Sequence, residues 1–76
     1  MSRPRLTVDI DAMRRARSGA GLSQFALSRA VDVSPGAIGL IETGRLQPSV
    51  ALLERIAAAV DTPAAELATI AEAGAA

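Results

Sequence analysis

Apolar residues recur through most of this chain at spacings of three and four, the repeat expected of helices that each bury one face. The pattern predicts five helices, over residues 9–18, 24–31, 35–43, 50–60 and 63–72. Strand-like alternation is confined to residues 6–8. We therefore expect an all-α fold, a compact five-helix bundle.

Residues that favour helix ends punctuate this pattern. The expected N-caps, whose side chains can accept bonds from free N–H groups, are Asp9, Ser23, Ser34, Ser49 and Thr62. Pro35 and Pro63 suit the first helical position. Gly44 follows the third helix, where a left-handed residue can end it. Asp32 stands in the turn after the second helix, and an aspartate can adopt the same conformation at some energetic cost.

The 76 residues correspond to one domain. We expect an N-terminal arm over residues 1–8, the helical domain over 9–72 and a frayed C-terminal tail over 73–76. Helices of about 8–11 residues are unstable alone and must pack into one bundle. A chain this short, with no cysteine for disulfides, needs well-packed helices or a partner.

Composition excludes most chemistry. The chain has no cysteine, histidine or lysine, so the usual zinc ligands, near-neutral acid–base group and Schiff-base nucleophile are missing. We expect no enzyme activity, no metal, no cofactor and no small-molecule ligand. No apolar run approaches the roughly 20 residues of a membrane helix, and a cytoplasmic location is expected.

The net charge of zero conceals an asymmetry. Residues 1–45 carry seven arginines and four acids, a net charge of +3, whereas residues 46–76 carry one arginine and four acids, a net charge of −3. A basic front would allow a polyanion to bind one face. Scattered surface charge explains the same numbers.

A larger set of positions falls in the register of a helix-turn-helix, two helices joined by a short turn. These are Arg17, Leu22, Ser23, Gln24, Leu27, Val31, Val33, Ser34, Ile38, Ile41, Glu42, Gly44, Pro48, Ser49, Leu53, Ile56, Ala57, Val60 and Leu67. In this arrangement the chain resembles the Cro/C1-type (XRE-like) helix-turn-helix family over about residues 10–70. The resemblance implies a lambda-repressor-like DNA-binding domain whose third helix enters the major groove.

The resemblance also implies roles for single residues. Gln24 would lie against the DNA backbone, where an amide donor at a helix N-terminus suits a phosphate oxygen; an ordinary exposed glutamine is the alternative. Arg17 and Glu42 would form a structural ion pair between the first and third helices, with a free DNA contact by Arg17 as the alternative.

The base-reading positions depart from the family pattern. They hold Pro35, Gly36, Ala37, Gly39 and Leu40, none of which is a bidentate hydrogen-bonding side chain. Ala37 and Leu40 can touch thymine methyl groups, and the glycines allow close backbone approach. We therefore expect few direct contacts to base edges, and DNA shape and phosphate contacts should contribute more of the specificity.

Polar contacts to DNA are expected mainly beside the recognition helix. Arg45 is the strongest candidate, and Ser34, Thr43, Gln47 and Arg29 are weaker ones. Arg3 and Arg5 form a short basic arm that can enter a minor groove or remain a disordered tail.

The function that the resemblance implies is a sequence-specific transcriptional regulator, of repressor type, that binds double-stranded DNA at a two-fold operator. We expect a homodimer formed through the fifth helix by Leu67, Ile70 and Ala71, although completion of the core explains the same apolar residues. The alternative function is a protein-interaction module of the same fold. This alternative is favoured by the neutral net charge and by the scarcity of polar residues in the third helix. It is also favoured by Phe25, which stands where the family usually has a polar residue.

Overall fold

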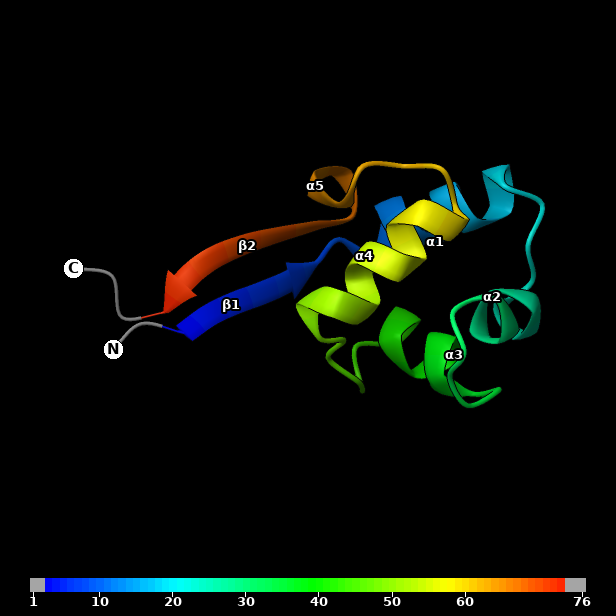
Figure 1. Ribbon diagram of the computed structural model, residues 1–76, viewed down its shortest axis with the longest axis horizontal. Coiled ribbons are helices and arrows are strands. Elements are labelled where there is room, and N and C mark those ends of the chain that lie inside the picture. Colours follow the sequence, from blue (N-terminus) through cyan, green and yellow to red (C-terminus); the bar gives the residue numbers. More distant parts are fainter. Residues whose placement is uncertain (1–2, 74–76) are drawn as a thin grey trace.

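The computed structural model describes residues 3–73, and the side chains of residues 6–69. The elements in chain order are β1 (Arg3–Val8), α1 (Ile10–Gly19), α2 (Gln24–Ala30), α3 (Ala37–Glu42), α4 (Val50–Ala59), α5 (Ala64–Leu67) and β2 (Ala68–Ala73). The five helices form one body, and a small two-stranded ribbon extends from it (Figure 1). Residues 74–76 of the expected tail lie outside the described part. No helix within that part has the length and apolar character needed to cross a membrane.

Side-chain caps begin three of the helices, as the sequence predicts. Asp9, Ser23 and Ser49 each accept a bond of 3.0 Å from the backbone N–H three residues later. The expected caps at Ser34 and Thr62 are wrong, because neither α3 nor α5 has a side-chain cap. The Thr62 hydroxyl instead donates to the Val60 carbonyl, 3.1 Å away.

The ends of α1 to α4 share one left-handed closure. The residue after each C-cap has a positive φ: 73° at Gly21, 59° at Asp32, 77° at Gly44 and 52° at Asp61. At α3, the Gly44 N–H bonds the Ile41 carbonyl and the Arg45 N–H bonds the Leu40 carbonyl, at 3.1 and 2.9 Å. This bond pair is a Schellman motif, and it satisfies carbonyls that the helix leaves free.

The core lies where the apolar faces of all five helices meet. Its fully buried large side chains are Met13, Leu27, Ile38, Ile41, Leu53, Ile56 and Leu67. Burial of each such side chain contributes roughly 1.5–3 kcal/mol. Because the helices are short, this shared core rather than helix propensity holds them together.

The chain ends differ from the sequence prediction. The expected fifth helix over 63–72 is only Ala64–Leu67, and residues 68–73 form β2, antiparallel to β1. The expected arm is therefore mostly a strand. Leu6 and Ala68 are buried against the core, and Asp9 N–H bonds the Leu67 carbonyl at 2.8 Å where the ladder starts. Long-range pairing thus overrides the helix propensity of the alanine-rich end.

The ribbon has two unlike edges. In an antiparallel pair, residues alternate between bonding the partner strand and pointing their peptide groups outward. Because Asp9 bonds Leu67, the peptide groups of Leu6 and Val8 point outward, and the Gln47 amide donates to the Leu6 carbonyl. Pro4, on the same outer edge, has no N–H to offer. The ribbon extends beyond the helical body, and the molecule measures 41 × 21 × 18 Å (Figure 1).

Candidate nucleic-acid interface

Helices α2 and α3 pack against each other at a fixed angle. Ser28 of α2 is fully buried, and its hydroxyl donates to the Pro35 carbonyl, 3.2 Å away, at the start of the turn into α3. The Ala37 N–H bonds the Ser34 carbonyl at 2.9 Å, so residues 34–37 form a tight turn. The third helix therefore starts at Ala37 rather than at Pro35 as predicted, and six residues join the two helices.

One buried carboxylate holds three helices together. Glu42, 4% exposed, accepts two bonds from the Arg17 guanidinium, at 2.7 Å to Oε2 and 3.1 Å to Oε1. Arg17 also donates to the Leu22 carbonyl at 2.9 Å. The two residues that the sequence analysis expected to pair thus lie together, in the bidentate geometry that arginine favours. Arg17 therefore makes three hydrogen bonds within the chain, and its side chain is 14% exposed.

Gln24 is also a partner of this carboxylate. Its Nε2 donates to Glu42 Oε1 at 2.9 Å, a contact that the sequence analysis missed. A Cβ added at Gly39 would lie 3.2 Å from Gln24 Oε1, so the amide passes directly over the bare backbone of that glycine. An amide nitrogen has two hydrogens. Glu42 takes one, and the exposed Gln24 keeps the other available for a phosphate oxygen.

The solvent face of α3 is almost free of long polar side chains. It consists of Gly36, Gly39, Leu40 and Thr43, a helical stripe at spacings of three and four. Ala37 does not belong to it: this residue is 8% exposed and packs inward. The prediction that Ala37 touches a thymine methyl group is corrected, because Ala37 lies on the buried side of α3 with Ile41, four residues later.

Exposed arginines flank this face. Arg45 follows the Gly44 turn and is exposed, as are Ser34, Pro35 and Thr43. Arg29 lies on α2, and its guanidinium sits 6.0 Å from the centre of the Phe25 ring. That distance is the outer limit of a cation–π contact.

Phe25 and Gln47 complete the surroundings of this face. Phe25 is 52% exposed, as a large apolar side chain on α2. The Gln47 amide donates one bond to the Leu6 carbonyl, which ties this exposed side chain to β1. The side chains of Arg3 and Arg5 lie outside the described residues.

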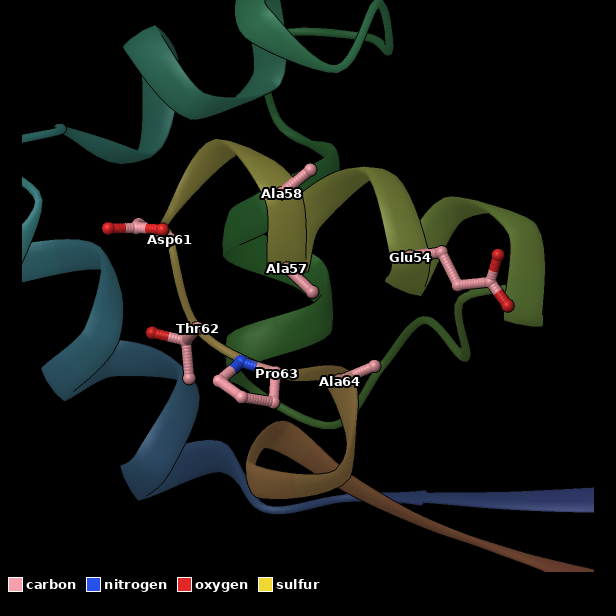
Figure 2. A pocket seen from close by; sticks show the side chains of 7 residues that line it. All are labelled: Glu54, Ala57, Ala58, Asp61, Thr62, Pro63 and Ala64. Atoms are coloured by element: carbon pink, nitrogen blue, oxygen red, sulfur yellow. The ribbon is translucent and has the colours of Figure 1, made fainter.

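Two carboxylates, those of Glu54 and Asp61, line a hollow on another part of the surface. This shallow hollow, of about 410 Å³, lies between α4 and α5. Figure 2 shows Glu54 at one end, Asp61 and Thr62 at the other, and alanines between them. Because this hollow has carboxylates and no cation in its lining, it repels a polyanion.

The expected dimer contacts are not placed as the sequence suggested. Leu67 is fully buried in the core of a single copy, and a covered side chain offers no surface to a second copy. That prediction is corrected: Leu67 completes the core. The side chains of Ile70 and Ala71 lie outside the described residues.

The paired helices, their fixed turn and the core beneath them define a helix-turn-helix domain. The helix-turn-helix domain model matches residues 11–70, and the chain belongs to this family, which is of the XRE/Cro-like kind and binds DNA. No curated protein sequence matches the chain. The match covers all five helices and confirms the fold expected from the sequence.

Proposed function

We propose that this chain is a sequence-specific transcriptional regulator of repressor type that places α3 in the major groove of a two-fold operator. One observation carries the proposal: the solvent face of α3 has no acidic side chain. The single carboxylate of this helix, Glu42, is buried and paired with Arg17. Arg45 and Gln24 stand beside that face with N–H groups available. Such groups fix a recognition helix on the phosphate backbone.

Selection from a random duplex DNA pool, repeated at two salt concentrations, tests the proposal. Enrichment of a salt-sensitive inverted repeat supports a dimeric regulator and supplies its operator; half-sites should lie about 34–36 Å apart. If folded protein enriches no sequence above non-specific binding, the proposal fails.

Arg45→Ala is expected to weaken binding to the selected duplex and to reduce the slope of log affinity against log salt by about one, since each phosphate contact contributes about 0.9. Arg55→Ala is the matched control, because Arg55 is an exposed arginine on α4, the helix that lines the acidic hollow. Fluorescence anisotropy at several salt concentrations measures both. An unchanged slope for Arg45→Ala, or an equal loss for Arg55→Ala, contradicts the assignment of Arg45.

We further propose that two copies pair through the outer edge of β2. A two-stranded ribbon is marginally stable in water, and a third strand stabilises it. The β1 edge is blocked by Pro4 and Gln47. By alternation, the outward peptide groups of β2 belong to Ala68, Ile70 and Glu72. The Ala68 N–H bonds the Ala64 carbonyl, so the peptide groups of Ile70 and Glu72 are the ones offered to a second copy.

Ile70→Pro is expected to convert the dimer to a monomer, because proline removes the central outward N–H of β2. Ile70→Ala is the control, since it removes the side chain and keeps the N–H. Light scattering after size exclusion, over a range of concentrations, measures the mass. A dimeric Ile70→Pro, or an unmodified chain that stays monomeric at high concentration, contradicts this pairing.

A second candidate function has its own support. Among the side chains of residues 6–69, the large apolar ones that are exposed are Phe25, Leu40 and Leu46. Such residues can mark a protein-binding surface. A protein-interaction module would retain its partner when Arg45 is replaced and would show no steep salt dependence on DNA.

A further inference from the structure

Two exposed leucines lie at the recognition helix and the turn after it. Leu40, on the solvent face of α3, is 44% exposed, and Leu46 is 39% exposed. Their backbones are joined, because the Leu46 N–H bonds the Leu40 carbonyl at 3.2 Å. Exposed side chains of this size have an energetic cost in water that a ligand with apolar groups would relieve.

Leu40 has no competitor on its face. Gly36 and Gly39 carry no side chain, and the Thr43 hydroxyl donates to the Leu40 carbonyl at 3.1 Å. The Gln24 amide, which crosses α3 at Gly39, comes from α2 and is restrained by its bond to Glu42. Of the side chains that α3 itself places on this face, the longest exposed one is aliphatic.

The charges around the pair favour DNA over an apolar protein surface. The carboxylate of α3 is buried beneath this face and neutralised by Arg17, and the exposed Arg45 lies between Leu40 and Leu46 in the chain. An apolar patch beside a free guanidinium complements a groove whose walls are phosphates. In the major groove, the apolar group on a base edge is the C5-methyl of thymine.

We infer that Leu40, supported by Leu46, reads the 5-methyl group of thymine as the main base-specific contact of this protein. The inference rests on the proposed function, because it requires α3 to enter the major groove. It names the feature that the operator must present: a thymine methyl group in each half-site at the position that faces Leu40. Recognition is then by apolar contact rather than by hydrogen bonds to base edges.

Uracil substitution tests the inference, because deoxyuridine pairs as thymidine does and lacks only the methyl group. The probe is the duplex enriched from the random pool, labelled and resynthesised with deoxyuridine at one thymine position of each half-site at a time. At the thymine that faces Leu40, the replacement is expected to weaken binding about fourfold per half-site. This factor corresponds to the transfer free energy of one buried group of CH₂ size. Leu40→Ala should bind the thymine and uracil duplexes equally.

Leu46→Ala separates the two leucines. It should reduce the thymine preference without abolishing it, since Leu46 supports Leu40 rather than making the contact itself. Thermal melts of both variants establish that they are folded, as expected for exposed positions.

The outcomes of this experiment distinguish a failure of the thymine contact from a failure of the proposed function. Specific binding that no uracil substitution changes, or a thymine preference that survives Leu40→Ala, overturns this inference and leaves the proposed function standing. A folded protein that enriches no duplex defeats both.

Discussion

Replacing Glu42 by alanine is expected to lower the free energy of unfolding by about 3 kcal/mol, the cost of removing one partner from a buried ion pair. The Arg17 guanidinium and the Gln24 amide would lose their shared acceptor. For a domain of this size, the melting temperature should fall by roughly 10–20 °C. Thermal unfolding followed by circular dichroism measures the change.

Two further variants identify the cause. Glu54→Ala removes an exposed carboxylate and should change the stability by less than about 0.5 kcal/mol. The double variant Arg17→Met with Glu42→Met removes both charges, and it should be more stable than Glu42→Ala, because no uncompensated charge remains buried. A Glu42→Ala protein that melts within 3 °C of the unmodified chain, about half a kcal/mol, would refute the role of this carboxylate.

Leu67→Ala is expected to cost about 2–5 kcal/mol, because it leaves a cavity at a fully buried site where α5 meets α1 and β2. In a small domain this loss can exceed half of the total stability. Urea denaturation at low protein concentration measures it, since dimer formation then contributes least.

Leu40→Ala is the matched control for this substitution. It deletes the same atoms from an exposed position and should leave the urea midpoint nearly unchanged while it alters DNA binding. If Leu67→Ala instead left the unfolding midpoint intact and shifted only the oligomeric state, Leu67 would be an interface residue and the description of the core would be wrong.

Glu42 links stability to the proposed DNA contact. It fixes Arg17 on α1, closes α3 onto the core and holds the Gln24 amide over Gly39. Loss of this carboxylate would therefore free the Gln24 side chain as well as weaken the fold. A phosphate contact by Gln24 depends on that restraint, because a fixed amide loses less rotamer entropy on binding.

Much of the helical body could be predicted from local sequence. Asp9, Ser23 and Ser49 cap helices where expected, and Gly44 takes the left-handed turn that ends α3. These signals are reliable because a cap or a positive φ depends on a few neighbouring residues. The predicted cap by the Ser34 hydroxyl was wrong. The Ala37 N–H bonds the Ser34 backbone carbonyl instead, and α3 has no side-chain cap.

The candidate site was predicted less completely than the fold. Ala37 lies four residues before the buried Ile41, on the same side of α3, and it is itself buried rather than exposed to a groove. The bond from Gln24 to Glu42 crosses two helices and depends on the missing side chain at Gly39. No spacing along the chain reports such a contact.

The five-helix body, the pairing of α2 with α3 and the helix-turn-helix family follow from local signals, because caps, periodicity and motif spacing depend on residues close together in the chain. The two chain ends depend on contacts between distant segments. Residues 68–73 have the alanine content of a helix, yet they form a strand because residues 3–8, sixty to seventy positions away, supply its hydrogen-bonding partner. Pairing at that distance outweighs local propensity, and it also moves Leu67 from an expected surface into the core.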